Sequence, residues 1–425
     1  MNYSDFLNQK AVATQALGFE PLAMNPRMRA DQRIVTDRAL RAGRYAIFAD
    51  CGLGKTLDEL EYAKQVVERH GPVLILAPLC VGVQTKHIAE SFGYDVRLVK
   101  SDAECTKGIN VCNYERLDKL DASRFAGVVL DESSILKNFN GKTLGRLLDL
   151  FQRTRFKLAC TATPAPNDYT EIGNHAEFLG VMRRSEMLSM FFVHDGGETQ
   201  TWRLKGHAQQ AFWDWVASWS TTYRKPSEVD PQCSDEGFNL PPLSIVHHTV
   251  ELPANDAGYL FSMPAETLGE QRRIKRTSID LRVAKVAELV PAKDYCVIWA
   301  DLNDEADALV KAIPGSVQIQ GSDAIERKEE ILWAFTNGEI KHLVTKEKIT
   351  SFGLNWQHCN TTVFAGPNYS YEAAYQAICR FHRFGQMRPV TAHWVLCDLE
   401  YNVFLALREK MERHEQMREA LKCAV

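Results

Sequence analysis

Short apolar runs recur along the first part of the chain, each followed by a more polar or amphipathic stretch. We expect buried strands at residues 45–49, 73–77, 96–99, 109–112, 127–131 and 157–161. Residues 57–70 carry leucine, tyrosine, alanine and valine at spacings of three and four, which predicts an amphipathic helix. Short buried strands that alternate with helices are typical of a mostly parallel sheet with helices on both faces.

The pattern changes to helices and loops between residues 170 and about 245. We expect helices at 171–180 and 184–192, a polar loop at 194–201 and a proline-rich linker at 226–242. The same region is rich in aromatic residues, and Phe212, Trp215 and Trp219 fall on one face of a helix. Core packing is the favoured interpretation of this face, and base stacking is the alternative.

A second series of strands and helices begins near residue 245. Strands are predicted at 245–252, 295–300, 316–319, 341–345, 362–365 and 390–396, and helices at 278–290 and 399–421. The chain therefore reads as two tandem α/β lobes. Its predicted parts are an N-terminal segment at 1–27, a first lobe at 28–192, a helical insertion and linker at 193–245, and a second lobe with a C-terminal helix at 246–425.

Composition narrows the class of protein. The chain has 425 residues, 45% hydrophobic and 24% charged, which is ordinary for a globular protein with an ample core. No apolar run approaches the roughly 20 residues needed to span a bilayer, and the N-terminus is too polar for a signal peptide. Eleven cysteines lack CxxC or zinc-ligand spacing, so we expect reduced core residues in a cytoplasmic protein. The net charge of −4 excludes an overall basic surface, so any nucleic-acid contact must be local.

Residues 45–56, YAIFADCGLGKT, combine a buried strand, a glycine-rich turn and the start of a helix. This arrangement predicts a phosphate-binding loop, because backbone N–H groups and the helix dipole then face an anion. Lys55 would reach the outer phosphates, and the Thr56 hydroxyl would bind Mg²⁺. Ala49 replaces the usual first glycine, and a chance glycine-rich turn is the alternative interpretation.

An acidic pair, Asp131 and Glu132, directly follows the buried strand at 127–131. Such a pair is costly at a strand end unless it binds something, and Mg²⁺ on Asp131 with a water oriented by Glu132 fits that need. A helix N-cap is the alternative for this segment. Thr161 and Thr163 offer hydroxyls at the tip of the last strand of this lobe. We expect Lys55, Asp131 and Thr161 at one edge of the sheet.

Two basic segments lie in the second lobe. Residues 271–276, QRRIKR, fit a solvated helix face and a phosphate-backbone contact equally well. Gln376, Arg380 and Arg383 are spaced to share one face of a helix, where two arginines could stabilise charge on a transferring phosphate. A solvated basic face is again the alternative.

Taken together, these segments resemble the superfamily-two helicases and, within them, the Swi/Snf-like branch. DCGLGKT at 50–56, DESSILKN at 131–138 and TATP at 161–164 resemble motifs I, II and III of that branch. GLNWQHCNTTVF at 353–364 and QAICRFHRFGQ at 376–386 resemble motifs V and VI. The resemblance covers residues 28–397 and implies two RecA-like lobes with ATP and Mg²⁺ bound in the cleft between them.

The resemblance also implies residue roles. Gln32 would contact adenine, and Gly52, Gly54, Lys55, Thr56 and Gly353 would belong to the nucleotide site. Asp131 and Thr56 would bind Mg²⁺ and Glu132 would be the catalytic base. Gln376, Arg380 and Arg383 would act from the second lobe. Pro78, Asn113, Tyr114 and Thr350 match or neighbour motifs that touch a nucleic-acid backbone, which runs opposite the ATP edge in this family.

Three departures from the family pattern are visible. Ser134 replaces the motif II histidine that couples hydrolysis to nucleic-acid contact, and Cys379 replaces a motif VI glycine. The stretch between motifs III and IV is far shorter than in chromatin remodellers, which favours a compact bacterial or bacteriophage form. We therefore expect an ATP-dependent motor that moves along DNA, with duplex DNA favoured, and we expect a monomer. A nucleotide-gated DNA-binding switch with slow hydrolysis and a single-strand or RNA unwinding helicase are the alternatives.

Overall fold

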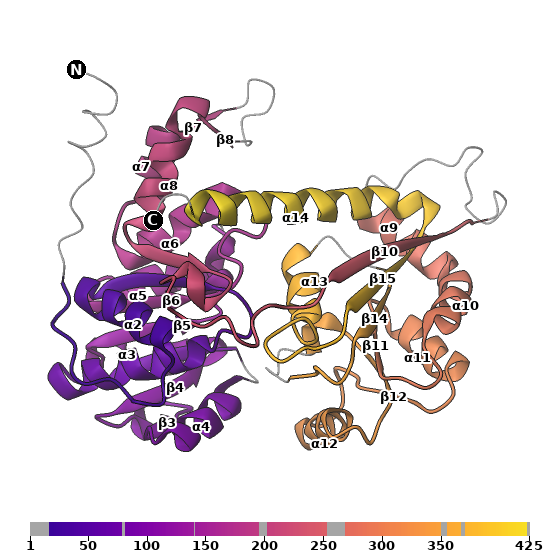
Figure 1. Cartoon of the computed structure of the whole chain (residues 1–425), viewed down its shortest axis with the longest axis horizontal. Coiled ribbons are helices and arrows are strands. Elements are labelled where there is room, and N and C mark those ends of the chain that lie inside the picture. The colour runs from indigo at the N-terminus through magenta and orange to yellow at the C-terminus, as the bar shows by residue number, and fades with distance from the viewer. Residues whose placement is uncertain are drawn as a thin grey trace. The chain divides into compact units, whose positions relative to one another are not determined.

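The computed structural model describes residues 17–78, 81–139, 141–194, 202–252, 268–349, 355–366 and 370–422 (Figure 1). The chain divides into two compact units. Unit 1 contains residues 1–235 together with 413–425, and unit 2 contains residues 236–412. None of the described helices is both long and apolar enough to cross a membrane.

Unit 1 is built on a seven-stranded sheet in the order β3-β4-β2-β5-β6-β1-β9. Its strands are β1 (Arg44–Ala49), β2 (Val73–Ala77), β3 (Val96–Leu98), β4 (Ile109–Asn113), β5 (Gly127–Asp131), β6 (Phe156–Cys160) and β9 (Ser220–Tyr223). Every pair of neighbouring strands is parallel, so all carboxyl ends meet at one edge. The helices are α2 (Ala30–Ala42), α3 (Lys55–Arg69), α4 (Val81–Phe92), α5 (Lys142–Phe151), α6 (Ile172–Leu179), α7 (Arg184–Phe191) and α8 (Gln209–Ala217).

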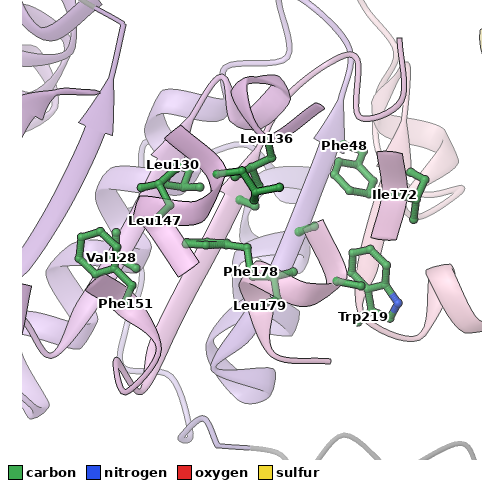
Figure 2. Packing of buried hydrophobic residues seen from close by; sticks show 14 of the residues in the cluster. Phe48, Val128, Leu130, Leu136, Leu147, Phe151, Ile172, Phe178, Leu179 and Trp219 are labelled. Atoms are coloured by element: carbon green, nitrogen blue, oxygen red, sulfur yellow. The ribbon is translucent and has the colours of Figure 1, made fainter. Parts of the chain in front are cut away.

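Helices cover both faces of this sheet. On one face, buried strand residues such as Phe48 and Leu130 belong to one apolar cluster with Leu147 and Phe151 of α5 and Phe178 of α6 (Figure 2). On the other face, α3 contacts β2, β5 and β6. The alternation of the strand side chains between two apolar layers explains why the sequence shows continuous apolar runs.

The aromatic residues of the helical segment belong to the core of unit 1. Phe212 and Trp219 are fully buried, and Trp215 packs against the same cluster. Core packing, the favoured interpretation of this aromatic face, is therefore confirmed.

Unit 2 is built on a six-stranded parallel sheet in the order β10-β15-β14-β11-β13-β12. Its strands are β10 (Leu243–Val250), β11 (Cys296–Ala300), β12 (Ser316–Gln318), β13 (His342–Thr345), β14 (Thr361–Ala365) and β15 (Val390–Cys397). Its helices are α9 (Leu268–Thr277), α10 (Ile279–Leu289), α11 (Asn303–Ala312), α12 (Ile325–Thr336), α13 (Tyr371–Ile378) and the first part of α14 (Tyr401–Lys422). Separate apolar clusters lie on its two faces, one under α10 and α11 and one under α12, α13 and α14. The predicted fold class, two tandem parallel α/β lobes, is confirmed.

The organisation differs from the predicted boundaries in three places. The predicted insertion supplies β9, which pairs with β1 at the edge of the first sheet. Its sequence, STTY, has no aliphatic run; the Ser220 hydroxyl donates to the Val216 carbonyl oxygen at 2.7 Å, and the Thr221 hydroxyl lies 2.8 Å from Tyr45 Oη. The hairpin of β7 (Phe192–His194) and β8 (Trp202–Leu204) flanks the predicted polar loop. The end of α14 groups with unit 1, because Met417 and Leu421 are buried in its core.

Candidate nucleotide-binding site

The loop between β1 and α3 has the geometry of an anion cradle. Gly52 and Gly54 have φ values of 87° and 77°, which residues with side chains rarely adopt. Helix α3 begins at Lys55 with Gly54 as its N-cap and no side-chain hydrogen bond to the cap. The first amide groups of α3 are thus not satisfied by a capping side chain, which suits a bound phosphate.

The Lys55 side chain is hydrogen-bonded to the backbone at the start of this loop. Its Nζ donates to the carbonyl oxygens of Ala49 at 2.8 Å and Asp50 at 3.2 Å. Burial alone would lower the pKa of Lys55, but the Cys51 thiol and the carboxyl groups of Glu132, Asp50 and Asp131 raise it above its ordinary value. Lys55 is therefore a cation surrounded by acids, and Thr56 follows it in the first turn of the helix.

The motif II acids lie at the carboxyl end of β5. Asp131 is 6% exposed and pairs in register with Cys160 of β6. Burial and then the Glu132 carboxylate raise the pKa of Asp131 to about 7, and Lys55 acts in the opposite direction. A divalent cation would stabilise the ionised form of such a group, so Asp131 fits the predicted metal ligand.

Glu132 has an unusual backbone. It combines φ 51° with ψ 56°, and it alone has positive φ among the non-glycine residues that the structure describes. Left-handed backbone at a residue with a side chain costs on the order of 1–3 kcal/mol and is concentrated at functional sites. The conformation turns the chain at the strand end, and Oε2 of Glu132 accepts a hydrogen bond from Thr161 Oγ1 at 3.4 Å.

Motif III supports this carboxylate. Thr161 and Thr163 are fully buried after β6, and the backbone N–H of Thr163 donates to Thr161 Oγ1 at 3.1 Å. The structure thus brings Lys55, Asp131, Glu132 and Thr161 to one edge of the sheet, where the order of the strands predicted them.

Gln32 is buried against the phosphate loop. Its Nε2 donates to the carbonyl oxygen of Gly54 at 3.1 Å, and its Oε1 accepts from the backbone N–H of Arg29 at 3.1 Å. The Arg29 guanidinium also donates to the Leu53 carbonyl oxygen at 2.7 Å and pairs with Asp31 at 2.8 Å. Gln32 and Arg29 therefore bind backbone carbonyl oxygens of the phosphate loop. Contact of Gln32 with adenine stays a prediction.

Two further acids on α3, Asp58 and Glu59, were not among the site residues predicted from the sequence. Asp58 and Glu59 are fully buried, and burial raises the pKa of each well above its ordinary value. Asp58 Oδ1 accepts from Thr36 Oγ1 at 3.3 Å, and the Asp131 carboxylate further raises the pKa of Glu59. One signal was present in the sequence, because Glu59 stands four residues after Lys55 and so shares its side of the helix.

The segment after Glu132 points into the core. Ser133 Oγ lies 3.1 Å from Nε2 of His175, which comes from α6 and is fully buried. Burial lowers the pKa of His175 to about 4. Ser134, at the position of the family histidine, is 3% exposed, and its hydroxyl lies 3.5 Å from the Glu132 carbonyl oxygen.

One of the predicted nucleic-acid contacts needs correction. Tyr114 is 5% exposed, and its hydroxyl donates to the Asp131 carbonyl oxygen at 2.7 Å, so it supports motif II from inside the core. Pro78 and Asn113 follow or end β2 and β4, whose carboxyl ends lie at the same edge as Asp131 because all strands run parallel. Contact of Pro78 and Asn113 with nucleic acid stays a prediction.

The motif VI residues of unit 2 do not share a helix. Helix α13 ends at Ile378, so Gln376 lies in it and Arg380 and Arg383 lie in the following turns. The predicted common helical face is therefore wrong, and the physical reason is the change of hydrogen bonding after Ile378, where Phe381 and His382 both donate to its carbonyl oxygen. Thr350 and Gly353 lie outside the described residues.

The basic run at residues 271–276 of the second lobe is only partly exposed. Arg272, Arg273 and Arg276 are exposed on α9, whereas Lys275 is 5% exposed and pairs with Asp301 at 2.7 Å. Only part of the run is thus open to a phosphate backbone. Six of the nine described cysteines are buried, as predicted for core residues, whereas Cys51, Cys105 and Cys233 are partly exposed.

Comparison with known proteins agrees with the motifs. Residues 285–385 match the family described as "Helicase conserved C-terminal domain". Two curated relatives, from Xenopus laevis and Xenopus tropicalis, are both named "SWI/SNF-related matrix-associated actin-dependent regulator of chromatin subfamily A-like protein 1". Each is 26% identical over 145 residues, which is 31% of this chain and 15% of the relative. The aligned part is thus a small fraction of the relatives' length.

A solved structure is similar over most of the chain. The "Sulfolobus solfataricus SWI2/SNF2 ATPase core in complex with dsDNA" matches with a TM-score of 0.44 and 17% identity, and covers 94% of both chains. The family match and the curated relatives confirm the resemblance to superfamily-two, Snf2-like helicases. A bacterial or bacteriophage form stays a prediction.

Proposed function

We propose that this chain, a relative of the Snf2-like superfamily-two helicases, is an ATP-dependent motor that moves along DNA. The observation that carries the proposal is the edge of the unit 1 sheet. There Lys55 lies over an uncapped helix N-terminus, and Asp131 and Glu132 form an acidic pair at the end of β5, which is separated from β1 by β6. The phosphates of ATP would bind at the first feature and Mg²⁺ at the second.

The residues of this edge fit the nucleotide and the metal ion. The amides of the glycine turn and of the first turn of α3, together with Lys55, would hold the phosphates. Asp131 and the Thr56 hydroxyl would hold Mg²⁺, which supplies charge neutralisation at the transferring phosphate when bound. The raised pKa of Asp131 is the observation that favours a cation at this position.

Glu132 is the proposed general base. Its backbone conformation and its hydrogen bond from Thr161 fix the carboxylate at the end of the strand. A carboxylate held in this way can orient a water and accept its proton during in-line attack. Thr161 then acts as a positioning residue, because it touches Glu132 rather than substrate.

The roles of the unit 2 residues rest on motif VI. We infer that Gln376, Arg380 and Arg383 take part in hydrolysis, and that the chain alternates its grip on the DNA backbone during the ATP cycle. Backbone contacts predict low sequence specificity and a strong dependence on salt. We also infer a cytoplasmic location and a monomeric state.

Polymer-stimulated ATP hydrolysis tests the proposal. The purified chain is assayed alone and with duplex DNA, single-stranded DNA and RNA, with Glu132→Gln as the inactive control. Stimulation of about tenfold or more by duplex DNA is expected. Stimulation by single strands alone would favour an unwinding helicase. ATP binding without stimulation by any polymer would favour the nucleotide-gated switch, for which the serine at position 134 is the motivating observation.

A further inference from the structure

The C-terminal end of α14 is anchored in unit 1 by apolar contacts. Met417 and Leu421, four residues apart, are 1% and 2% exposed and belong to the main core cluster of the unit. The first part of the same helix packs elsewhere, because Val403, Phe404 and Leu407 belong to a core cluster of unit 2. The last turns of α14 are therefore a built part of unit 1 rather than a loose tail.

Polar contacts fix the same segment along its other sides. Arg224 pairs with Glu415 and with Glu419, the latter at 2.5 Å. Lys422 lies 3.6 Å from Glu228, and the Tyr169 hydroxyl donates to the Arg413 carbonyl oxygen at 2.9 Å. These contacts hold the helix without help from a further charged residue of the same segment, which faces the phosphate loop.

That residue is Arg418. Its side chain is 9% exposed, and its guanidinium lies 3.2 Å from Oδ1 of Asp50. Asp50 Oδ1 also accepts from the backbone N–H of Cys51 at 2.6 Å, and the Asp50 carbonyl oxygen accepts from Lys55 Nζ at 3.2 Å. Asp50 therefore contacts Arg418 through its carboxylate and Lys55 through its carbonyl oxygen.

The charge of Asp50 is the reason this contact matters. A carboxylate at the start of a phosphate loop repels an incoming anion and competes for Lys55. Among the described groups of unit 1 near Asp50 are Arg418, Lys55, the Cys51 thiol and, one turn earlier on α14, His414. Burial lowers the pKa of His414 to about 3, so it is neutral near pH 7 and the compensating cation from α14 is Arg418.

We propose that Arg418 is a positioning residue for the nucleotide site, which acts by neutralising Asp50 and holding it away from the bound phosphates. The inference rests on the proposed ATP site of unit 1. It makes nucleotide affinity depend on a residue more than 350 positions from the phosphate loop in sequence. Docking of the end of α14 is then a requirement for tight nucleotide binding.

Calorimetric binding of Mg²⁺–ADP to the full chain tests this role. Arg418→Ala is expected to weaken binding about tenfold or more, as for loss of a charged hydrogen bond in a desolvated site. Arg418→Lys should restore part of the affinity. Arg408→Ala removes a positive charge from the same helix, and Arg408 is exposed and pairs with Glu412 one turn further on, so it is the matched control and should bind ADP like the unmodified chain.

A second variant separates positioning from mere structural support. In Asp50→Asn the charge to be neutralised is gone, so adding Arg418→Ala should cost little, and the double variant should bind ADP more tightly than Arg418→Ala alone. Equal affinity of Arg418→Ala and the unmodified chain would overturn the proposal, as would a failure of Asp50→Asn to rescue. If the unmodified chain itself does not bind ADP, the proposed function fails instead.

Discussion

Each sheet has lysine and acidic residues at the edge where its strands end, but the charges are paired differently at the two edges. In unit 1, Lys55 donates to two backbone carbonyl oxygens, and the nearby carboxyl groups of Asp131 and Glu59 have raised pKa values. In unit 2, Lys275 pairs with Asp301 at 2.7 Å and donates to the Gly366 carbonyl oxygen at 3.0 Å. At the first edge several acids share one lysine, whereas at the second Lys275 has a carboxylate partner of its own.

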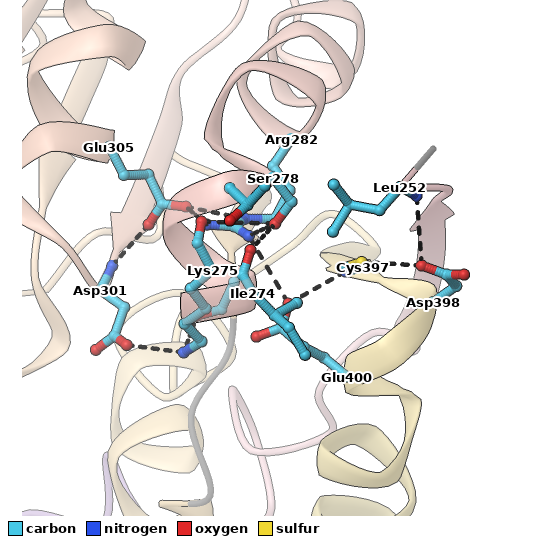
Figure 3. A network of polar contacts seen from close by, with 12 residues as sticks. Leu252, Ile274, Lys275, Ser278, Arg282, Asp301, Glu305, Cys397, Asp398 and Glu400 are labelled. Atoms are coloured by element: carbon cyan, nitrogen blue, oxygen red, sulfur yellow. Dashed lines mark hydrogen bonds and ion pairs between the residues drawn. The ribbon is translucent and has the colours of Figure 1, made fainter. Parts of the chain in front are cut away.

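The network of unit 2 extends this contrast into the core. Arg282 is fully buried and contacts Glu305 at 2.6 Å and Glu400 at 3.7 Å (Figure 3). It also donates to the Lys275 carbonyl oxygen at 2.7 Å, so the network joins α9, α10, α11 and the turn before α14. Buried ions that are paired in this way have a structural role, whereas a group of acids that share one lysine marks a place for a ligand. The comparison therefore assigns ligand binding to the first edge and cohesion to the second.

The largest expected effect is a loss of ATP hydrolysis when the first edge is changed, with no loss of the fold. Glu132→Gln should reduce ATP turnover about 10²- to 10⁴-fold, the usual contribution of a general base. ADP affinity and melting temperature should stay close to those of the unmodified chain, because Gln keeps the shape of the side chain. Glu288→Gln, on the exposed side of α10, is the control. Normal turnover in Glu132→Gln would remove the base assignment.

The second edge should respond in the opposite way. Arg282→Ala leaves Glu305 and Glu400 buried without their cation, which should cost about 3–5 kcal/mol of unfolding free energy for unit 2. Chemical denaturation followed by tryptophan fluorescence measures the loss. Lys285→Ala removes a partly exposed cation of the same helix and should change stability by less than about 1 kcal/mol. Similar effects of the two substitutions would contradict a structural role for the network.

Acid should weaken unit 1 through His175. Its pKa is about 4 in the folded chain and about 6.5 when unfolded, so the unfolded state binds more protons between these values. The stability is fully present above pH 6.5 and is lost as the pH falls, by about 2–3 kcal/mol at pH 4. His175→Gln should flatten this slope in unfolding measured across pH, and His87→Gln, an exposed control, should not. An unchanged slope in His175→Gln would contradict the expectation.

The smallest expected effect is a loss of nucleotide affinity in a Gln32 variant, which tests what Gln32 contacts. Its amide holds the carbonyl oxygen of Gly54, so Gln32→Ala should cost about 1 kcal/mol of nucleotide binding through a looser loop. This loss should be equal for ADP and GDP, because the loop holds the phosphates that both share. Titration calorimetry with both nucleotides measures it. A loss confined to ADP would instead support contact of Gln32 with adenine.

Most of the fold and part of the site were predictable from the sequence. Fully buried parallel strands must be apolar along their length, so runs such as VLILA and GVVLD in the first lobe and YCVIWA in the second showed both lobes and the shared edge of Lys55 and Asp131. Strand β9 was not predictable because STTY has no aliphatic run, and the hydroxyl groups of Ser220 and Thr221 are hydrogen-bonded inside the fold. The end of α13 was missed because helical spacing continues in QAICRFHR after the helix stops.

The remaining parts of the site depend on contacts distant in sequence. Nothing near Arg418 shows that it would meet Asp50, and the burial of Asp58 is set by α2, whose Thr36 binds it. The ion network of unit 2 likewise joins Arg282 to Glu400 across the lobe. Local periodicity gives an element its faces, but only the packed fold gives a charged residue its partner.

The most direct test of the contrast between the two edges is a thermal unfolding measurement with and without Mg²⁺–ADP. A ligand that binds only the folded state at about 100 times its dissociation constant stabilises it by about 2.7 kcal/mol. The account predicts a raised melting temperature that is lost in Lys55→Ala and kept in Lys275→Met, provided that this variant folds. An unchanged melting temperature with nucleotide, or a shift that survives Lys55→Ala, would contradict the assignment of the nucleotide site to the edge of unit 1.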